Sequence, residues 1–335
     1  MNINKNIKIL IVMHKPVDFP KGKYFVPIHA GRDVALNRSK DGLISKKDFS
    51  WLCDNTIGDN TGDNISIKNR YYNELSALYW AWKNYDKLGN PDYIGLMHYR
   101  RHFVFNEEYY KKKISKETAK NQGFSVISEK YFDKEYANRI GLCDKNIESM
   151  CEQYDAIVSY PSHLSLSYGK HHTLRTDYIE ILRLKAKDFD LMVNILKRKY
   201  PNFADKIEDY VNNDQKLGYQ MFIMKKELFF EYCDFLFGIL FEIEKQVNFE
   251  EYTIHEKRTL GYLGEIMMSL FFIINADRGL KIKNCGISFI ECENAKHFYK
   301  RYLSRLMKNI FSIRNSDNRS HKIITVLGVK IKLKK

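Results

Sequence analysis

The chain has 335 residues, of which 44% are hydrophobic, and it carries a formal net charge of +14. This length and apolar content suit a large folded domain and exclude an intrinsically disordered protein. The six cysteines form no C-x-x-C pair and no zinc-type cluster, so we expect reduced thiols, several of them in the core. The apolar runs are too short for a secretion signal or for a bilayer span of about 20 residues, which favours a cytoplasmic protein.

Short apolar segments predict the fold class. Continuous apolar runs, each ended by polar or turn-forming residues, predict buried strands over 7–13, 93–97, 155–160 and 219–224. Apolar residues at helical spacing predict helices over 73–84, 226–247 and 258–275. Short strands that alternate with helices are typical of an α/β domain with a mainly parallel sheet.

A dense turn-forming segment, 54–64 (DNTIGDNTGDN), separates the first predicted strand from the first predicted helix. Its carboxylates, Asp54 and Asp63 among them, suit a divalent metal or sugar hydroxyls. The spacing is not that of a calcium-binding EF-hand loop. Composition alone therefore favours a long Asx-rich turn over a ligand site.

The positive charge is concentrated at the end of the chain. Residues 294–335 hold twelve Lys/Arg and one acid, which accounts for +11 of the total +14. Within them, the pattern predicts a basic amphipathic helix over 295–313, a polar linker over 316–320 and a small pair of strands over 322–335. We expect a domain over 1–293 and a separate tail over 294–335. Such a tail suits an anionic membrane surface, a nucleic acid or a solvated face.

Polar and cationic side chains follow the predicted strands. His14-Lys15 comes directly after the first strand, and His98-Tyr99-Arg100-Arg101 comes after the second. In open α/β sheets, ligands bind beyond the carboxyl ends of the strands. Arginine forks and lysine point charges suit a diphosphate there. The alternative is ion pairing with Asp63, Asp92 or Glu74, and without further context we favour it slightly.

Glu265 lies in the middle of the apolar helix predicted over 258–275. An acid in such a helix is either paired or functional. Burial would raise the pKa of its carboxyl, which suits a general base. An ion pair with Arg258 is the structural alternative, and the sequence favours neither.

Ordered sequence blocks extend over roughly 7–290. They include His14-Lys15, 54–69, 74–84 (ELSALYWAWKN), 93–101 (YIGLMHYRR), 221–224 and 258–265. Together these blocks resemble bacterial capsule and exopolysaccharide glycosyltransferases grouped as domain of unknown function 4422. The chain has Glu265-Ile266 where that family usually has Glu-Arg. The repeated Asp-Asn motif leaves open whether Asp54 or Asp63 faces the sugar.

The resemblance implies a GT-A-like fold, in which a Rossmann-related, mainly parallel sheet flanked by helices binds a nucleotide sugar. Relatives include galactofuranosyltransferases that use UDP-galactofuranose, so a UDP-hexose is the expected donor and galactofuranose the suggested sugar. The expected acceptor is a polyprenyl-diphosphate-linked oligosaccharide in capsule, O-antigen or exopolysaccharide synthesis. The expected location is the inner face of the plasma membrane, where the basic tail would bind anionic lipid.

The roles of individual residues are our own inference from their chemistry within this expected fold. Most GT-A enzymes hold a metal on the diphosphate with an Asp-x-Asp strand end, where this chain has His98-Tyr99-Arg100. We therefore expect no required cofactor, with Mg²⁺ or Mn²⁺ as the alternative, and we expect Arg100 and Arg101 to stabilise the departing UDP. Glu265 would deprotonate the acceptor hydroxyl in an inverting transfer. The residues expected to bind the donor are His14, Lys15, Asp54, Asp63, Asn64, Lys68, Asn69, His98 and Tyr99.

Two other classes of protein remain as alternatives. A nucleic-acid-binding protein would act through the basic tail, but the chain has no recognised nucleic-acid motif and we expect no nucleic-acid partner. A non-catalytic carbohydrate-binding module would bind sugar without affinity for UDP.

Overall fold

The computed structural model divides the chain into two compact units. The larger unit extends to Ile127 and from Glu135 to Phe289, and the smaller comprises Ser128–Lys134 and the chain from Ile290 onward. The residues that the structure describes are 5–39, 41–121, 126–133, 135–168, 172–292, 295–315, 321–326 and 329–334. No helix in these described ranges is both long and apolar enough to cross a membrane.

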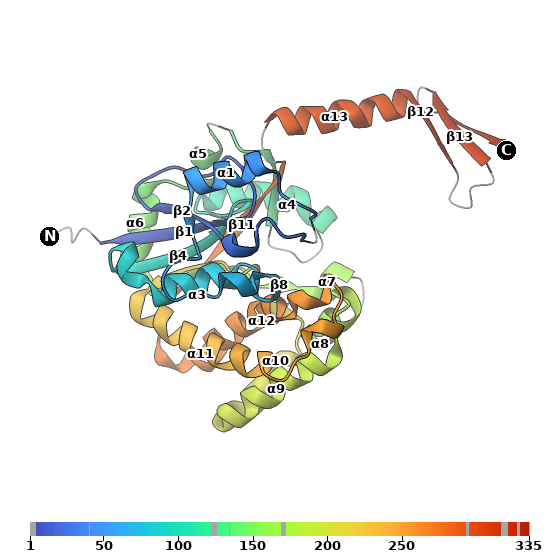
Figure 1. The fold of residues 1–335 in the computed structure, drawn as a ribbon. Helices are drawn as coiled ribbons and strands as arrows, with labels where there is room; N and C mark the ends of the chain where they lie inside the picture. Colours follow the sequence, from blue (N-terminus) through green and yellow to red (C-terminus); the bar gives the residue numbers. More distant parts are fainter. Residues whose placement is uncertain are drawn as a thin grey trace. The chain divides into compact units, whose positions relative to one another are not determined.

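A sheet forms the centre of the fold (Figure 1). Among the described residues it has nine strands in the order β10-β7-β11-β5-β4-β1-β2-β3, with β6 paired to β11. β1 is buried along almost its whole length because it lies between two neighbours, as a continuous apolar run predicts. The strands are β1 Ile7–Met13, β2 Phe25–His29, β3 Ile57–Gly58, β4 Tyr93–His98, β5 Arg101–Val104, β6 Val126–Tyr131, β7 Ala156–Ser159, β10 Phe222–Lys225 and β11 Ile282–Cys292.

The sheet is mixed, which corrects the prediction of a mainly parallel sheet. β1 is parallel to both β2 and β4. β10, however, is antiparallel to both of its neighbours, β4 and β7, and β5 is antiparallel to β4 and β11. All the predicted strands exist, but β10 runs antiparallel to its neighbours, where a mainly parallel sheet was expected. A short apolar run indicates burial on both faces and carries no information about strand direction.

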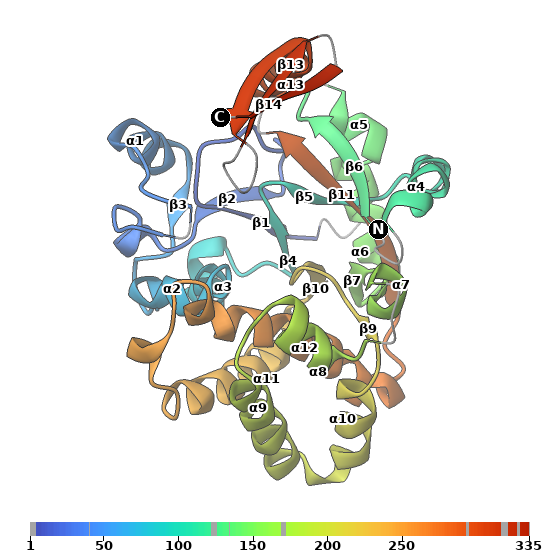
Figure 2. The same ribbon diagram turned by 90° about the vertical axis from the view of Figure 1, so that its right-hand side faces the viewer.

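A layer of helices lies along one side of the sheet (Figures 1 and 2). The three predicted helices are confirmed as α3 (Leu75–Lys83), α11 (Lys226–Glu244) and α12 (Thr259–Ile274). They pack through aromatic side chains, and the rings of Trp82 and Phe237 stack with their centroids 5.6 Å apart. The layer is completed by α9 (Ala186–Lys199) and α10 (Ala204–Val211).

Shorter elements complete the larger unit. The Asx-rich segment is not one long turn, because Asp54 and Asn55 are the last residues of α1 and Ile57–Gly58 form β3. The remaining elements are α1 Lys46–Asn55, α2 Asn69–Tyr72, α4 Glu107–Asn121, α5 Tyr136–Ile140, α6 Asp144–Gln153, α7 Leu164–Tyr168, α8 Leu174–Thr176, β8 Ser162–His163 and β9 Gln215–Lys216. The cysteines are free, and those that are buried are Cys151, Cys233, Cys285 and Cys292.

The smaller unit contains the C-terminal helix and sheet. α13 (Ala295–Ile310) ends before the predicted limit at 313, because the chain continues as β12 (Phe311–Asn315). The predicted pair of strands is part of a sheet with three described strands, β12-β13-β14, in which β13 is His321–Val326 and β14 is Val329–Lys334. The linker predicted over 316–320 lies outside the described residues.

Candidate active site

Histidines occupy the carboxyl ends of adjacent parallel strands. His14 follows β1, His29 ends β2 and His98 ends β4. Met13 is opposite His29 and Val12 is opposite His98 in the two parallel pairings of β1. The histidines therefore share the edge at which open α/β sheets bind ligands. The pKa of His29 is lowered to about 3, mainly by burial and to a smaller extent by the charges of Arg32 and His14.

His98 is neutral at pH 7 and is held in one tautomer. Burial and then the nearby Arg101 charge lower the pKa of its imidazole to about 4, against smaller upward effects of the Tyr219 carbonyl and Glu265. Its Nε2 lies 2.5 Å from the carbonyl oxygen of Tyr219. A carbonyl only accepts hydrogen bonds, so Nε2 carries the proton and Nδ1 is the acceptor nitrogen.

The loop after β9 delivers that carbonyl in a strained conformation. Tyr219 and Gln220 have φ values of 66° and 51°, a region that non-glycine residues rarely adopt. Among the described residues, the fully buried Gln220 amide nitrogen Nε2 has no hydrogen-bond partner, although its Oε1 accepts a bond from Tyr232. Strain and an unsatisfied buried amide are features that cluster at functional sites.

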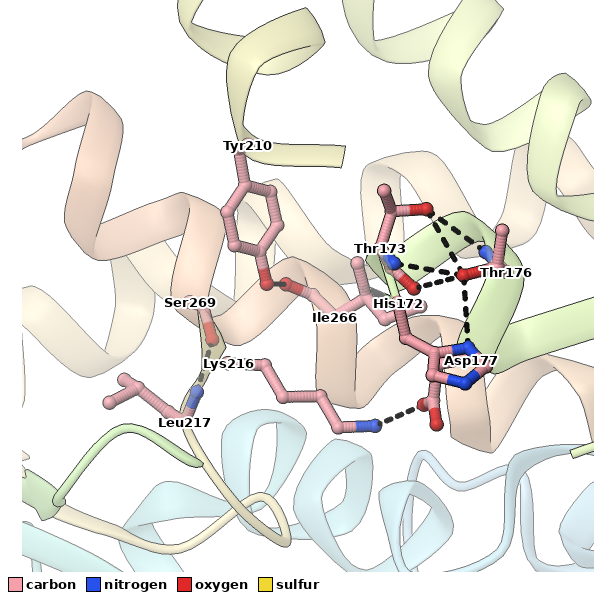
Figure 3. A network of polar contacts seen from close by, with 9 residues as sticks. All are labelled: His172, Thr173, Thr176, Asp177, Tyr210, Lys216, Leu217, Ile266 and Ser269. Carbon is pink, nitrogen blue, oxygen red and sulfur yellow. Dashed lines mark hydrogen bonds and ion pairs between the residues drawn. The ribbon is translucent and has the colours of Figure 1, made fainter. Parts of the chain in front are cut away.

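Hydrogen bonds from two directions hold this loop in place. The Gly218 amide donates to Ser159 Oγ at 2.8 Å, which ties the loop to the end of β7. The Leu217 amide donates to Ser269 Oγ of α12 at 2.7 Å, as Figure 3 shows. The loop therefore keeps a fixed position between the sheet and α12.

Glu265 of α12 lies within a group of charged side chains. Burial raises the pKa of its carboxyl, and the negative charge of Glu74 raises it further. Lys216, Arg101 and His98 act in the opposite direction, and the net shift is upward. These residues come from β9, β5 and the end of β4, which are far apart in the sequence. Packing of α12 against the sheet brings them together.

Lys216 is a largely buried cation of this group. Its ammonium forms an ion pair with Asp177 at 3.0 Å, and the two side chains are only 13% and 5% exposed (Figure 3). Burial lowers the pKa of Lys216, but Asp177 and Glu265 raise it more, so the net shift is upward. A buried ion pair is costly to desolvate and is weak evidence for a purely stabilising role.

The predicted arginines lie on aromatic rings. The Arg101 guanidinium is 4.2 Å from the centroid of Tyr219 and 5.3 Å from that of Phe289. The Arg100 guanidinium is 4.6 Å from the same Phe289 ring. Stacking leaves the edges of a guanidinium able to donate hydrogen bonds to an anion.

Arg258 was the alternative ion-pair partner considered for Glu265, but it forms its hydrogen bonds with other groups. Its Nε donates to Asn73 Oδ1 and its Nη1 to the Tyr262 hydroxyl, both at 2.9 Å. Asn73 has a φ of 53° and lies just before Glu74. Arg258 therefore supports the turn that places Glu74 near Glu265.

Asp59 is the buried acid of the Asx-rich segment, and sequence analysis did not single it out. It accepts hydrogen bonds from the Gly31 and Arg32 amides at 2.7 and 3.1 Å and from the hydroxyls of Ser66 and Ser76, each at 2.6 Å. These bonds join the end of β2 to α3. Asp-Asn occurs three times within 54–64, so the local sequence does not distinguish Asp59 from Asp54 and Asp63.

Several residues predicted to bind the donor lie outside the Glu265 group. Asp54 is exposed on α1, and the exposed Asp63 accepts a hydrogen bond from the Tyr79 hydroxyl at 3.1 Å. Lys68 pairs with Glu244 at 2.9 Å, at the end of α11. Asn64 bonds within its own turn, to the Gly62 carbonyl.

Other predicted donor residues are closer to the strand edge. The His14 and Tyr99 rings meet edge to face at 5.1 Å, and the Lys15 ammonium is 5.7 Å from the Tyr99 centroid. His14 also pairs with Asp41 at 3.6 Å. Asn69 donates to the Asn73 carbonyl at 2.6 Å, so it supports the same turn as Arg258.

The structure thus brings Glu265, Arg101 and His98 together. The catalytic and binding roles of the predicted site residues stay predictions. Among the described residues, no group of three or more His, Cys, Asp and Glu side chains could hold a metal ion.

A fold similar to this mixed sheet with its layer of helices is also found in a glycosyltransferase. The apo structure of the WbbM bifunctional glycosyltransferase superposes on this chain with a TM-score of 0.70 and 28% sequence identity, over 86% of this chain and 46% of that one. The chain therefore spans about half the length of that protein. The chain belongs to the family described as Domain of unknown function (DUF4422), which matches residues 8–276. No curated protein matches the chain.

Proposed function

We propose that the chain is a glycosyltransferase that moves a hexose from a UDP-sugar to a lipid-linked oligosaccharide during surface polysaccharide synthesis. The similarity to WbbM supports the class of enzyme. The single observation that carries the proposal is the group formed by Glu265, Arg101 and His98 at the carboxyl edge of the sheet. It combines a carboxyl group of raised pKa with a guanidinium suited to a diphosphate.

The proposed reaction is a single displacement. An acceptor hydroxyl oxygen attacks the anomeric carbon of the donor, and the bond from that carbon to the diphosphate oxygen breaks. The hydroxyl proton passes to Glu265, and UDP leaves with the electron pair of the broken bond. This course inverts the configuration at the anomeric carbon.

The charge balance around Glu265 fits a general base. A base must be deprotonated and still hold a proton well, so its pKa should lie near the working pH. Burial and Glu74 raise the pKa of Glu265, while Lys216 and Arg101 oppose the rise. Lys216 would therefore keep Glu265 ionised without touching the substrate.

Arg101 and Arg100 are proposed to stabilise the departing UDP. A preorganised guanidinium aimed at developing negative charge lowers the barrier without reorganisation. Tyr219 and Phe289 hold these guanidinium groups by stacking. His14, Lys15 and Tyr99 are proposed to bind the nucleotide at the neighbouring strand end.

The finer assignments follow from the resemblance. UDP-galactofuranose is the proposed donor, a polyprenyl-diphosphate-linked glycan the proposed acceptor, and the inner face of the plasma membrane the proposed location. α13 is proposed to lie at the lipid surface, because its described apolar residues Tyr302, Leu303, Leu306 and Met307 are exposed.

A panel of UDP-sugars tests the proposal. A ligand bound only by the native state raises the melting temperature. The donor and UDP should raise it, and the same donor should release UDP when acceptor is added. A shift with free sugars and none with UDP would instead favour a carbohydrate-binding module.

A further inference from the structure

The C-terminal sheet has one face made mainly of apolar side chains. Directly paired residues of antiparallel strands lie on the same face. The pairs are Val326 with Val329, Ile324 with Ile331 and Lys322 with Leu333, so Lys322 is the one charged residue on this side of the two strands. We call this surface the apolar face, and define it by Ile324, Val326, Val329, Ile331 and Leu333.

The apolar face is open in the structure. Val329 is 64% exposed, and Ile331 and Leu333 are each 48% exposed. Thr325, on the opposite face, is only 5% exposed. α13 lies against β12 and β13 in the same unit. A sheet normally buries its apolar face, so the exposure of this one needs a partner.

The charge of the same segment identifies the kind of partner. Residues 294–335 carry +11, and Lys322 and Lys332 of this sheet are exposed. A basic segment with an open apolar surface matches an anionic lipid interface, which offers both negative headgroups and an acyl boundary. A nucleic acid offers the phosphates without the apolar phase.

We propose that the apolar face inserts into the headgroup region of an anionic bilayer, as a second membrane contact beside α13. The proposal rests on the proposed placement of the protein at a membrane and is independent of the chemistry of the transfer. Apolar insertion resists salt, whereas lysine attraction is screened. The two contributions can therefore be separated.

Flotation with vesicles tests the proposal on the full chain. The vesicles contain phosphatidylcholine with or without phosphatidylglycerol, at about 0.05 M and about 0.5 M salt. The variant V329S/I331S/L333S should lose about tenfold or more in partitioning at high salt, because apolar area is lost. The variant K322Q, which removes the lysine that lies beside Leu333 on the same face, should weaken binding mainly at low salt.

A tryptophan reporter checks the geometry without depending on stability. L333W should shift its emission to the blue on anionic vesicles, whereas K332W, on the opposite face of the same strand, should not. Unchanged flotation of the triple variant, or equal shifts for both reporters, would overturn the proposal. A second outcome would also overturn it. If the wild type sediments as a dimer, and the triple variant is monomeric but floats as well as the wild type, the face binds a second copy of the chain. Absence of UDP-sugar turnover would leave these results unaffected.

Discussion

Glu265 differs from an ordinary surface carboxylate in its surroundings. Burial and Glu74 raise the pKa of its carboxyl, and three nearby cationic or polar groups limit the rise. Glu250, by contrast, is exposed. A carboxyl group whose pKa is shifted by burial and by nearby charges is typical of catalytic acids and bases.

Replacing Glu265 by Gln should abolish base catalysis while preserving shape. We expect kcat/KM for UDP release to fall by about 10²-fold or more, since general-base catalysis contributes about 10²–10⁴-fold. The melting-temperature shift caused by UDP should persist. E250Q serves as the control and should match the wild type, and full activity of E265Q would remove Glu265 from the mechanism.

Lys216 should control the pH dependence of the reaction. Its charge lowers the pKa of Glu265, so its removal raises that pKa. Base activity is lost as pH falls through the pKa of Glu265, so the acid limb of kcat/KM should move to higher pH. The comparison is K216M/D177N against D177N, which keeps Lys216.

K216M alone should be destabilised, because Asp177 would remain buried without its cation. Breaking a buried pair costs about 3–5 kcal/mol in unfolding free energy. Chemical denaturation should place K216M/D177N above K216M in stability. An unmoved acid limb in the double variant would mean that Lys216 does not act on the base.

At the scale of elements, two glycines distinguish close packing from open space. A Cβ at Gly261 of α12 would lie 2.0 Å from Asn73 Nδ2, whereas a Cβ at Gly238 of α11 would meet nothing within 4 Å. G261A should therefore lower the free energy of unfolding by about 1–3 kcal/mol through overpacking. G238A should raise it by up to about 1 kcal/mol, because alanine favours helix. Equal effects in denaturation would contradict this packing.

The Asx-rich segment offers a second comparison. Asp59 satisfies four donors in the interior, so D59A should cost about 3 kcal/mol or more in unfolding free energy. D54A and D63A remove exposed carboxylates and should each stay within about 0.5 kcal/mol. If D63A lowered the free energy of unfolding as much as D59A, the buried acid of this segment would not be Asp59 alone.

At the scale of the whole molecule, metal dependence tests how the diphosphate is stabilised. If arginines perform this role, UDP release should continue in EDTA at close to the untreated rate. Addition of Mn²⁺ should then change the rate little. Loss of turnover in EDTA that Mn²⁺ restores would refute the metal-independent proposal and would point to a metal on the donor diphosphate.

Local patterns predicted much of this architecture. Helices α3, α11 and α12 and the strands β1, β4, β7 and β10 follow from apolar periodicity, because each buries its own apolar residues wherever its neighbours lie. The ordered blocks also identified the family correctly. Glu265 was recognisable because a lone acid in an apolar helix requires an explanation.

Tertiary structure alone decided the direction of β10, the burial of Asp59 in place of Asp54 or Asp63, and the proximity of Lys216 and Tyr219 to Glu265. Each depends on contacts between segments far apart in the chain, which no local pattern records. The sequence by itself determined which segments are buried and which acid stands among apolar neighbours. Packing decided which charges surround that acid, because the strength of an electrostatic interaction depends on distance and burial.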